Sequence, residues 1–193
     1  HLQRKYSIRL NYDSAMDLGL LEAGLRKISL FDPTEPIKGG SNLIMETTSG
    51  SDIWFRPYSV IFQYEGPLED KRLMYAIRES IRIAKELETV KIEEKPLRFN
   101  PNSLSLGVGN FDSEEVFQRE LGLTAQKLQR KLYGGGSVAY YQGSMDFNLY
   151  LGTEQEIREF VIQTQKSLGT KKLEFEGQTQ PASSLDDLLA RLE

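Results

Sequence analysis

The stretch that decides the predicted fold is DSEEVFQRELGLTAQKLQRKL (residues 112–132), followed directly by YGGGSVAYYQGSMDFNLYL (residues 133–151). Apolar residues at helical spacing in the first part predict a helix that ends near the triple glycine at 134–136. The second part predicts a β-hairpin of two strands, 137–141 and 145–151. A helix followed by two strands is the central portion of a β-α-β-β-α-β unit.

The same order of elements recurs in the first half of the chain. The first half predicts strands over 5–12, 42–48 and 53–64, short strand-like pieces over 89–94 and 97–99 that are separated by Pro96, and helices over 14–28 and 66–87. The second half adds strands over 104–108 and 171–176 and a helix over 153–168. The sequence therefore predicts an α+β fold of two tandem ferredoxin-like (β-α-β-β-α-β) halves packed as one unit. The predicted boundaries are 1–99 and 100–176 for the two halves, and 177–193 for a linker and short tail helix.

The tail has its own pattern. Residues 177–182 are polar and contain Gly and Pro, which predicts a flexible linker. Ser184 with Asp187 predicts a helix N-terminus. A helix of this length does not hold alone in water. Residues 184–193 must therefore dock on the chain's own domain, dock on a partner, or remain disordered. We expect a partner-dependent docking element outside the core, which uses one stripe of leucines: Leu185, Leu188, Leu189 and Leu192.

The segment 42–64 is the most aromatic part of the chain. It predicts the strands 42–48 and 53–64, with Pro57 at an edge or a bulge because proline cannot donate a ladder hydrogen bond. Aromatic rings in a hairpin are typical of cross-strand packing in a core. The alternative is a platform for a partner. For that interpretation the candidate contact residues are Trp54, Phe55 and Tyr58.

Several function classes lack the residues that they require. The chain has no cysteine, and its one histidine is His1. Disulfides, thiolate nucleophiles and cysteine-bound metals are excluded, and histidine-based catalysis or zinc binding has no usable ligand. We expect no metal, no cofactor and no catalytic activity. Only an enzyme built on Asp, Glu, Lys, Arg, Ser and Tyr stays open.

Charge and hydropathy restrict the partners. The net charge of -4 and the pI near 5.3 do not favour a general nucleic-acid or anionic-membrane binder. No apolar run approaches the ~20 residues that a membrane span needs. No signal peptide is recognised, and zero cysteines fit a reducing compartment. We therefore expect a cytoplasmic protein without a membrane partner.

Residues 113–132 carry an alternative. Glu120 to Thr124, followed by Gln126 to Leu132, resembles the helix-turn-helix pattern of many bacterial regulators. Gln118 and Lys131 depart from that pattern, where a small and an apolar residue are usual. The resemblance implies a set of side chains that face a DNA groove: Thr124, Gln126, Lys127, Gln129 and Arg130.

The function class that we infer from the sequence is a protein-binding or assembly module. Its partner is another protein or a second copy of the chain, and its contacts are the aromatic hairpin and the tail helix. The alternative is a DNA-binding transcriptional regulator that uses residues 113–132.

Overall fold

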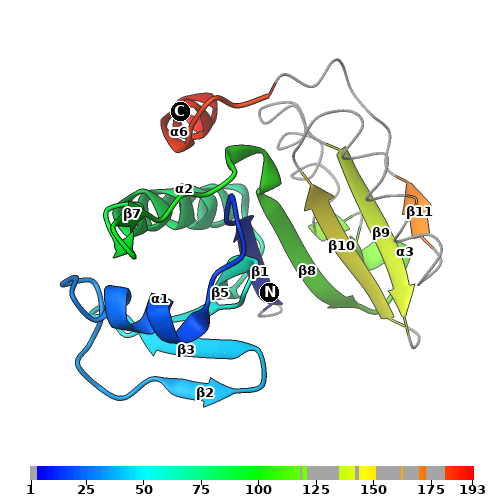
Figure 1. The fold of residues 1–193 in the computed structure, drawn as a ribbon. Coiled ribbons are helices and arrows are strands. Elements are labelled where there is room, and N and C mark those ends of the chain that lie inside the picture. Colours follow the sequence, from blue (N-terminus) through cyan, green and yellow to red (C-terminus); the bar gives the residue numbers. More distant parts are fainter. Residues whose placement is uncertain are drawn as a thin grey trace.

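A computed structural model describes residues 4–117, 119–120, 135–141, 144–150, 162, 170–172 and 181–193. Its main sheet has nine strands in the order β11-β9-β10-β8-β1-β5-β4-β3-β2, and neighbouring strands are antiparallel (Figure 1). Helices accompany this sheet, and the last of them lies at the C-terminus. The mixed α+β class that the sequence predicts is therefore confirmed.

Strand β1 (Arg4–Asn11) lies inside the sheet, between β5 (Ser59–Gly66) and β8 (Ser105–Phe111). Its even-numbered residues are buried and its odd-numbered residues are half-buried or exposed. This alternation follows from the pleat, since successive side chains in a strand point to opposite faces. The buried face of β1 holds Tyr6, Ile8 and Leu10 in the core.

The predicted duplication into two ferredoxin-like halves is not confirmed. In a tandem arrangement β8 would lie between β10 (Ser144–Tyr150) and β11 (Thr170–Lys172). Instead β8 lies between β1 and β10, and β11 pairs with β9 (Gly135–Tyr141). The strand β8 thus joins the two predicted halves into one sheet.

The pieces 89–94 and 97–99, predicted to close the first half, do not add a strand to the main sheet. Residues 91–96 form a small separate hairpin of β6 (Lys91–Ile92) and β7 (Lys95–Pro96), and Phe99 forms an isolated bridge with Tyr12 at the end of β1. Pro96 has no N–H to donate, so it does not extend a ladder. One edge of β1 is therefore taken by β8, whose Leu106 and Val108 pair with Ile8 and Tyr6 and continue the buried face.

The aromatic segment contains three strands where two were expected. The predicted strand 53–64 is split into β4 (Asp52–Phe55) and β5. The chain reverses at Arg56–Tyr58, since proline at the centre interrupts the ladder. β3 (Asn42–Glu46) pairs with β4, and the edge strand β2 (Ile37–Gly39), which was not among the predicted strands, pairs with β3.

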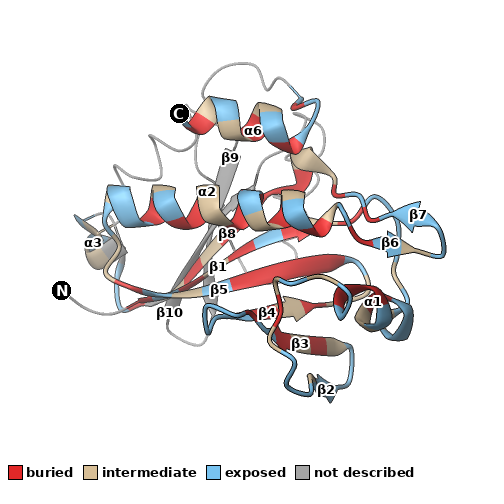
Figure 2. Cartoon of the chain, turned by 90° about the vertical axis from the view of Figure 1, so that its left-hand side faces the viewer, coloured by how far each residue is buried: buried red, intermediate tan, exposed pale blue. Residues whose placement is uncertain are grey.

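Helices α1 (Leu18–Leu25) and α2 (Asp70–Leu87) contribute buried side chains to the same core as the sheet. α1 begins later than predicted. The side chain of Asp17 accepts a hydrogen bond from the Leu20 N–H at 3.0 Å and caps the helix. The buried side of α2 faces β1 and β5 (Figure 2), through Leu73, Ala76, Ile77, Ser80, Ile81, Ala84 and Leu87.

A third layer is formed by α6 (Leu185–Leu192), which packs on α2 (Figure 2). Its cap is the predicted one, since the Ser184 hydroxyl accepts from the Asp187 N–H at 3.1 Å. The short helix α3 (Glu114–Phe117) begins after Ser113. The helix predicted over 153–168 lies outside the described residues, apart from Ile162.

Candidate functional site

One face of the sheet is turned away from the core, and we call it the outer face. Cross-strand partners share a face, so the register defines a row of neighbours across five strands. This row runs from β1 to β2 through Arg9, Ile61, Trp54, Ile44 and Ile37. Ile61 is buried but does not belong to the main core cluster, and Ile37 is 66% exposed. The outer face thus carries an apolar row with an arginine at one end.

The turn between β4 and β5, Arg56–Tyr58, places a tyrosine in solvent. Tyr58 is 72% exposed, the highest value among the exposed large hydrophobic side chains of the described residues. Its backbone is held, because the Tyr58 carbonyl accepts from the Tyr12 N–H at 3.0 Å. The Pro57 carbonyl accepts from the Met16 N–H at 2.7 Å, and the Arg56 N–H donates to the Ser59 carbonyl at 2.8 Å. The tyrosine ring is therefore presented on a fixed backbone.

Two arginines, Arg9 and Arg56, lie near this turn. The Arg56 Nε donates to the Asn42 Oδ1 at 2.9 Å, which orients the guanidinium along the outer face. In the described part of the chain neither Arg9 nor Arg56 forms an ion pair. The pKa of Arg9 is lowered, first because its position on the sheet removes hydration and then because Arg56 repels it.

The three predicted aromatic contact residues do not share one environment. Trp54 is half-buried on the outer face, two residues before Arg56, and Tyr58 is exposed at the turn, two residues after it. Phe55 is fully buried on the opposite face and packs edge-on against Phe31, with ring centroids 5.9 Å apart. Because successive residues of a strand alternate faces, Trp54 and Phe55 cannot both point to one partner.

The tail helix packs on its own chain. Leu185, Leu188 and Leu192 are buried in the core cluster, and Leu189 is half-buried against it. Ahead of the helix, Asn102 exchanges two hydrogen bonds with the backbone of Ala182, at 2.6 and 3.0 Å. The expectation that residues 184–193 lie outside the core is therefore wrong. Partner binding by the four leucines stays a prediction, and it requires α6 to leave α2.

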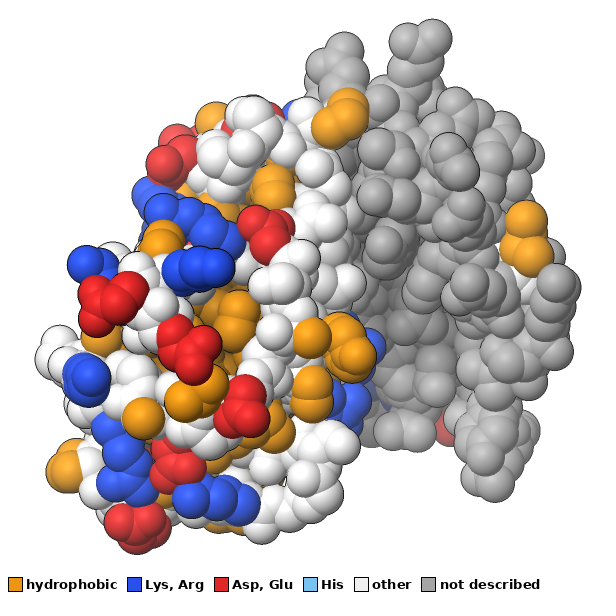
Figure 3. Space-filling view, in the orientation of Figure 1, with side chains coloured by type: hydrophobic (Ala, Val, Ile, Leu, Met, Phe, Trp, Pro, Cys, Tyr) orange, Lys and Arg blue, Asp and Glu red, His pale blue; other side chains and the backbone are white. Residues whose placement is uncertain are grey.

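The alternative DNA-binding residues Thr124, Gln126, Lys127, Gln129 and Arg130 lie outside the described residues. Their proximity to one another stays a prediction. On the described part of the face shown in Figure 3, acidic and basic side chains are interspersed with hydrophobic ones. No large area of one charge sign is visible on that part of the surface.

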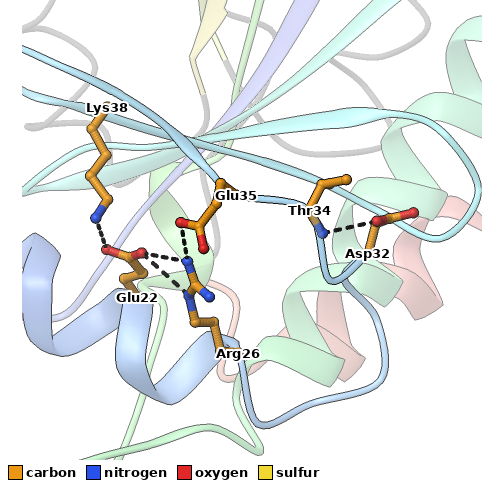
Figure 4. Close-up of polar contacts among 6 residues, drawn as sticks. All are labelled: Glu22, Arg26, Asp32, Thr34, Glu35 and Lys38. Carbon is orange, nitrogen blue, oxygen red and sulfur yellow. Dashed lines mark hydrogen bonds and ion pairs between the residues drawn. The ribbon is translucent and has the colours of Figure 1, made fainter.

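An ion-pair network connects α1 with β2 and with the segment before β2 (Figure 4). The Glu22 carboxylate binds Lys38 Nζ at 2.8 Å and Arg26 at 3.1 Å, and Arg26 also binds Glu35 at 2.8 Å. These contacts lower the pKa of Glu22, the hydrogen bond from Lys38 being the largest cause. Each charge here has a partner, so the network fits a structural role and differs from the arginines of the outer face.

A pocket of about 510 Å³ lies beside the β6–β7 hairpin. Buried Gly24 and Val90 and the charged Lys27, Lys91 and Glu93 are among its lining residues. A Cβ on Gly24 would lie 2.9 Å from the side chains of Ile92 and Val90, so glycine permits this close approach. The lining charges have both signs, and the pocket therefore selects neither an anion nor a cation.

Within the described ranges, no group of three or more His, Cys, Asp or Glu side chains is placed to hold a metal ion. None of the described helices combines the length and the apolar composition that a membrane crossing needs.

Arg9 and Arg56 were not singled out from the sequence. The signal for Arg9 was present, since the alternation of residues 5–12 already placed it opposite the buried tyrosines and leucine. Arg56 could be assigned to the same face only once the strand 53–64 was known to break at Pro57. Their proximity across β5 depends on long-range strand order, which local patterns do not contain.

The fold defines an α+β protein with a largely antiparallel sheet, and its candidate site is a solvent-facing surface with aromatic and arginine residues. The chain matches no protein-family model, and no significant match to a curated protein is found. The proposed function is therefore inferred from the described residues and their geometry.

Proposed function

We propose that this chain is a non-catalytic protein-binding module, and that it contacts its partner with the β4–β5 turn and the adjoining outer face of the sheet. The observation that carries the proposal is Tyr58, 72% exposed on a turn whose backbone is held by hydrogen bonds. Tyrosine, tryptophan and arginine dominate the binding energy of protein interfaces. This surface presents all three, as Tyr58, Trp54 and Arg56.

Pre-organisation supports the same function. An exposed aromatic ring on a mobile loop loses conformational entropy when it binds, which reduces affinity. The carbonyls of Pro57 and Tyr58 are already bonded to backbone N–H groups of the segment after β1. Only the side-chain torsions of Tyr58 remain to be ordered on binding.

The residue content of the chain supports a non-catalytic role. The sequence lacks cysteine and has one histidine, at position 1, so the commonest nucleophiles and general bases are missing. The Tyr64 hydroxyl lies 2.7 Å from the Ser80 hydroxyl, and its pKa is raised to about 12, mainly by burial. A tyrosine with such a pKa stays protonated at neutral pH and does not serve as a base.

The test replaces Tyr58 with a photo-crosslinking phenylalanine analogue and irradiates the protein in an extract of its source cells. Tyr75 is the matched control position, because it is also a tyrosine and is 58% exposed on α2. We expect a protein adduct from position 58 that position 75 does not give. Binding of the purified adduct partner should weaken about tenfold or more in Tyr58→Ala and stay unchanged in Tyr75→Ala.

Two results would refute the proposal. One is the same set of adducts from both positions. The other is a captured partner whose affinity does not depend on Tyr58.

A further inference from the structure

Arg9 and Arg56 lie on one face of the sheet, with β5 between their strands. Arg9 pairs with Ile61 of β5, and Ile61 pairs with Trp54, two residues before Arg56. Arg56 is bonded through Nε to Asn42, which leaves its terminal nitrogens available. Five other arginines of the described residues, Arg4, Arg26, Arg72, Arg82 and Arg191, each form an ion pair with a carboxylate. Within the described residues, no carboxylate forms an ion pair with either of the two outer-face arginines.

The acidic residues of the outer face lie away from this pair. Asp52 is opposite Glu46 on the neighbouring strand. Asp52 is four residues from Arg56, a separation of about 13 Å along a strand. Along the strands, Arg56 therefore lies on one side of the apolar row, and Asp52 and Glu46 lie on the other. Arg9 lies at the β1 end of the row itself, and the remaining carboxylate of this face, Glu65, is opposite Lys5, four residues from Arg9.

An anion between the arginines would relieve an unfavourable arrangement. Two guanidinium groups near each other repel, and partial burial reduces the hydration that would offset the repulsion. The direction of the Arg9 pKa shift agrees with this. Arginine binds planar carboxylates in a bidentate manner, and Trp54 beside it offers a flat apolar surface. A carboxylate flanked by apolar side chains thus matches the face in charge and in shape.

The overall charge favours a protein over a nucleic acid as the source of these anions. The chain has a net charge of -4, and a polyphosphate backbone brings many further negative charges. An acidic peptide segment brings only a few. It also supplies apolar side chains that can contact the half-buried Trp54 and Ile44.

We propose that the outer face around Arg9, Trp54 and Arg56 binds an acidic segment of a partner protein, with its carboxylates on the two guanidinium groups and its apolar side chains on Trp54 and Ile44. This inference rests on the proposed function, because it names the chemistry of the partner at the same surface. It adds that binding weakens with salt, since charged groups near solvent are screened.

The test uses Trp54 as its own reporter. Trp54 is the only tryptophan in the chain, so intrinsic tryptophan fluorescence reports on this face alone. The probe is a peptide of about eight residues that alternates glutamate with valine, and the control peptide has glutamine in place of glutamate. We expect the glutamate peptide to change the Trp54 emission saturably, and to bind at least about tenfold more tightly than the glutamine peptide.

Two double variants separate the site from general electrostatics. Arg9→Gln with Arg56→Gln should weaken the glutamate peptide by about tenfold or more. Lys71→Gln with Arg82→Gln makes the same charge change on α2 and should bind as the wild type does. The first variant should melt close to the wild-type temperature, because no ion pair is lost and the removal of a repelling pair offsets the loss of the hydrogen bond from Arg56 to Asn42. Its loss of binding is then not a loss of fold.

The inference is overturned if the two peptides bind alike, or if the Arg9 and Arg56 double variant binds as tightly as the wild type. It is also overturned if a single-stranded oligonucleotide changes the Trp54 emission at lower concentration than the glutamate peptide. A partner captured at position 58 through a neutral segment contradicts the inference and leaves the proposed function standing. Peptide binding without any specific adduct at position 58 supports the inference and counts against the proposed function.

Discussion

Helix α6 and the β4–β5 turn both carry apolar side chains near the surface of the chain, but they are held in opposite ways. In α6 the backbone is a short helix at the end of the chain, and three leucine side chains are buried against α2. At the turn the backbone is bonded to the body of the protein, and the tyrosine side chain is in solvent. Buried side chains hold α6 in place, whereas backbone bonds hold the turn and leave its side chain free.

The difference separates stability from binding. A buried leucine contributes to folding, so it is available to a partner only if the helix detaches. Tyr58 contributes little to folding, so it can contact a partner without any rearrangement. A pattern of apolar residues alone does not distinguish α6 from the turn, because in both an apolar side chain can be covered either by the same chain or by a partner.

The largest effect is expected within the aromatic hairpin. Phe55→Ala should lower the free energy of unfolding by about 3–5 kcal/mol, because Phe55 is fully buried against the core. Tyr58→Ala should change it by no more than ~0.5 kcal/mol, as exposed positions generally do. Urea denaturation of both variants measures this. Equal losses would show that Tyr58 is a packing residue and would remove the contrast with α6.

The next effect tests the tail. Leu188→Ala should lower the free energy of unfolding by about 2–5 kcal/mol, because Leu188 is 1% exposed in the core. Leu189→Ala, on a half-buried position of the same helix, is the control and should cost less than ~1 kcal/mol. Chemical denaturation of both variants and of the wild type measures the two losses. If Leu188→Ala leaves the stability unchanged, α6 is detached in solution, and its leucines are then available to bind a partner.

The smallest effect is electrostatic and depends on pH. The pKa of Glu22 is lowered by Lys38 and Arg26, so the ionised carboxylate stabilises the fold. For a lowered pKa, this contribution is present above the unfolded value near ~4.3 and is lost as pH falls through the folded value. Glu22→Gln should therefore melt slightly below the wild type near pH ~7, and the two should converge below pH ~4. A difference that persists in acid would assign the effect to packing of the side chain.

Local patterns predicted most of the elements. The alternation of residues 5–12 defined β1, the apolar stripe of 66–87 defined α2, and Ser184 with its leucines defined α6. Each of these residue patterns lies within a single helix or a single strand. The amphipathic stripe of α6 could not reveal its partner, because a leucine stripe fits α2 of the same chain as well as it fits another protein.

Strand order was not predicted, for a different physical reason. The edge of β1 accepts any strand that continues its buried face, and both 97–99 and 105–111 have alternating apolar residues. Pro96 and the hairpin at Glu93 and Glu94, whose φ angles are positive, keep residues 91–96 out of the main sheet, and the first candidate reaches only the end of β1, where Phe99 bridges Tyr12. The binding surface depends on the same long-range order, so Arg9 and Arg56 could not be brought together from sequence patterns.

The position of β8 has a consequence for how the chain is made. β1 is synthesised before β5, with which it pairs, but its other neighbour, β8, emerges only after α2 and the β6–β7 hairpin. Until β8 emerges, the β1 edge that pairs with Leu106 and Val108 has unpaired backbone groups, which can pair with another nascent chain. Translation that pauses between residues 66 and 105 should therefore favour aggregation on the ribosome.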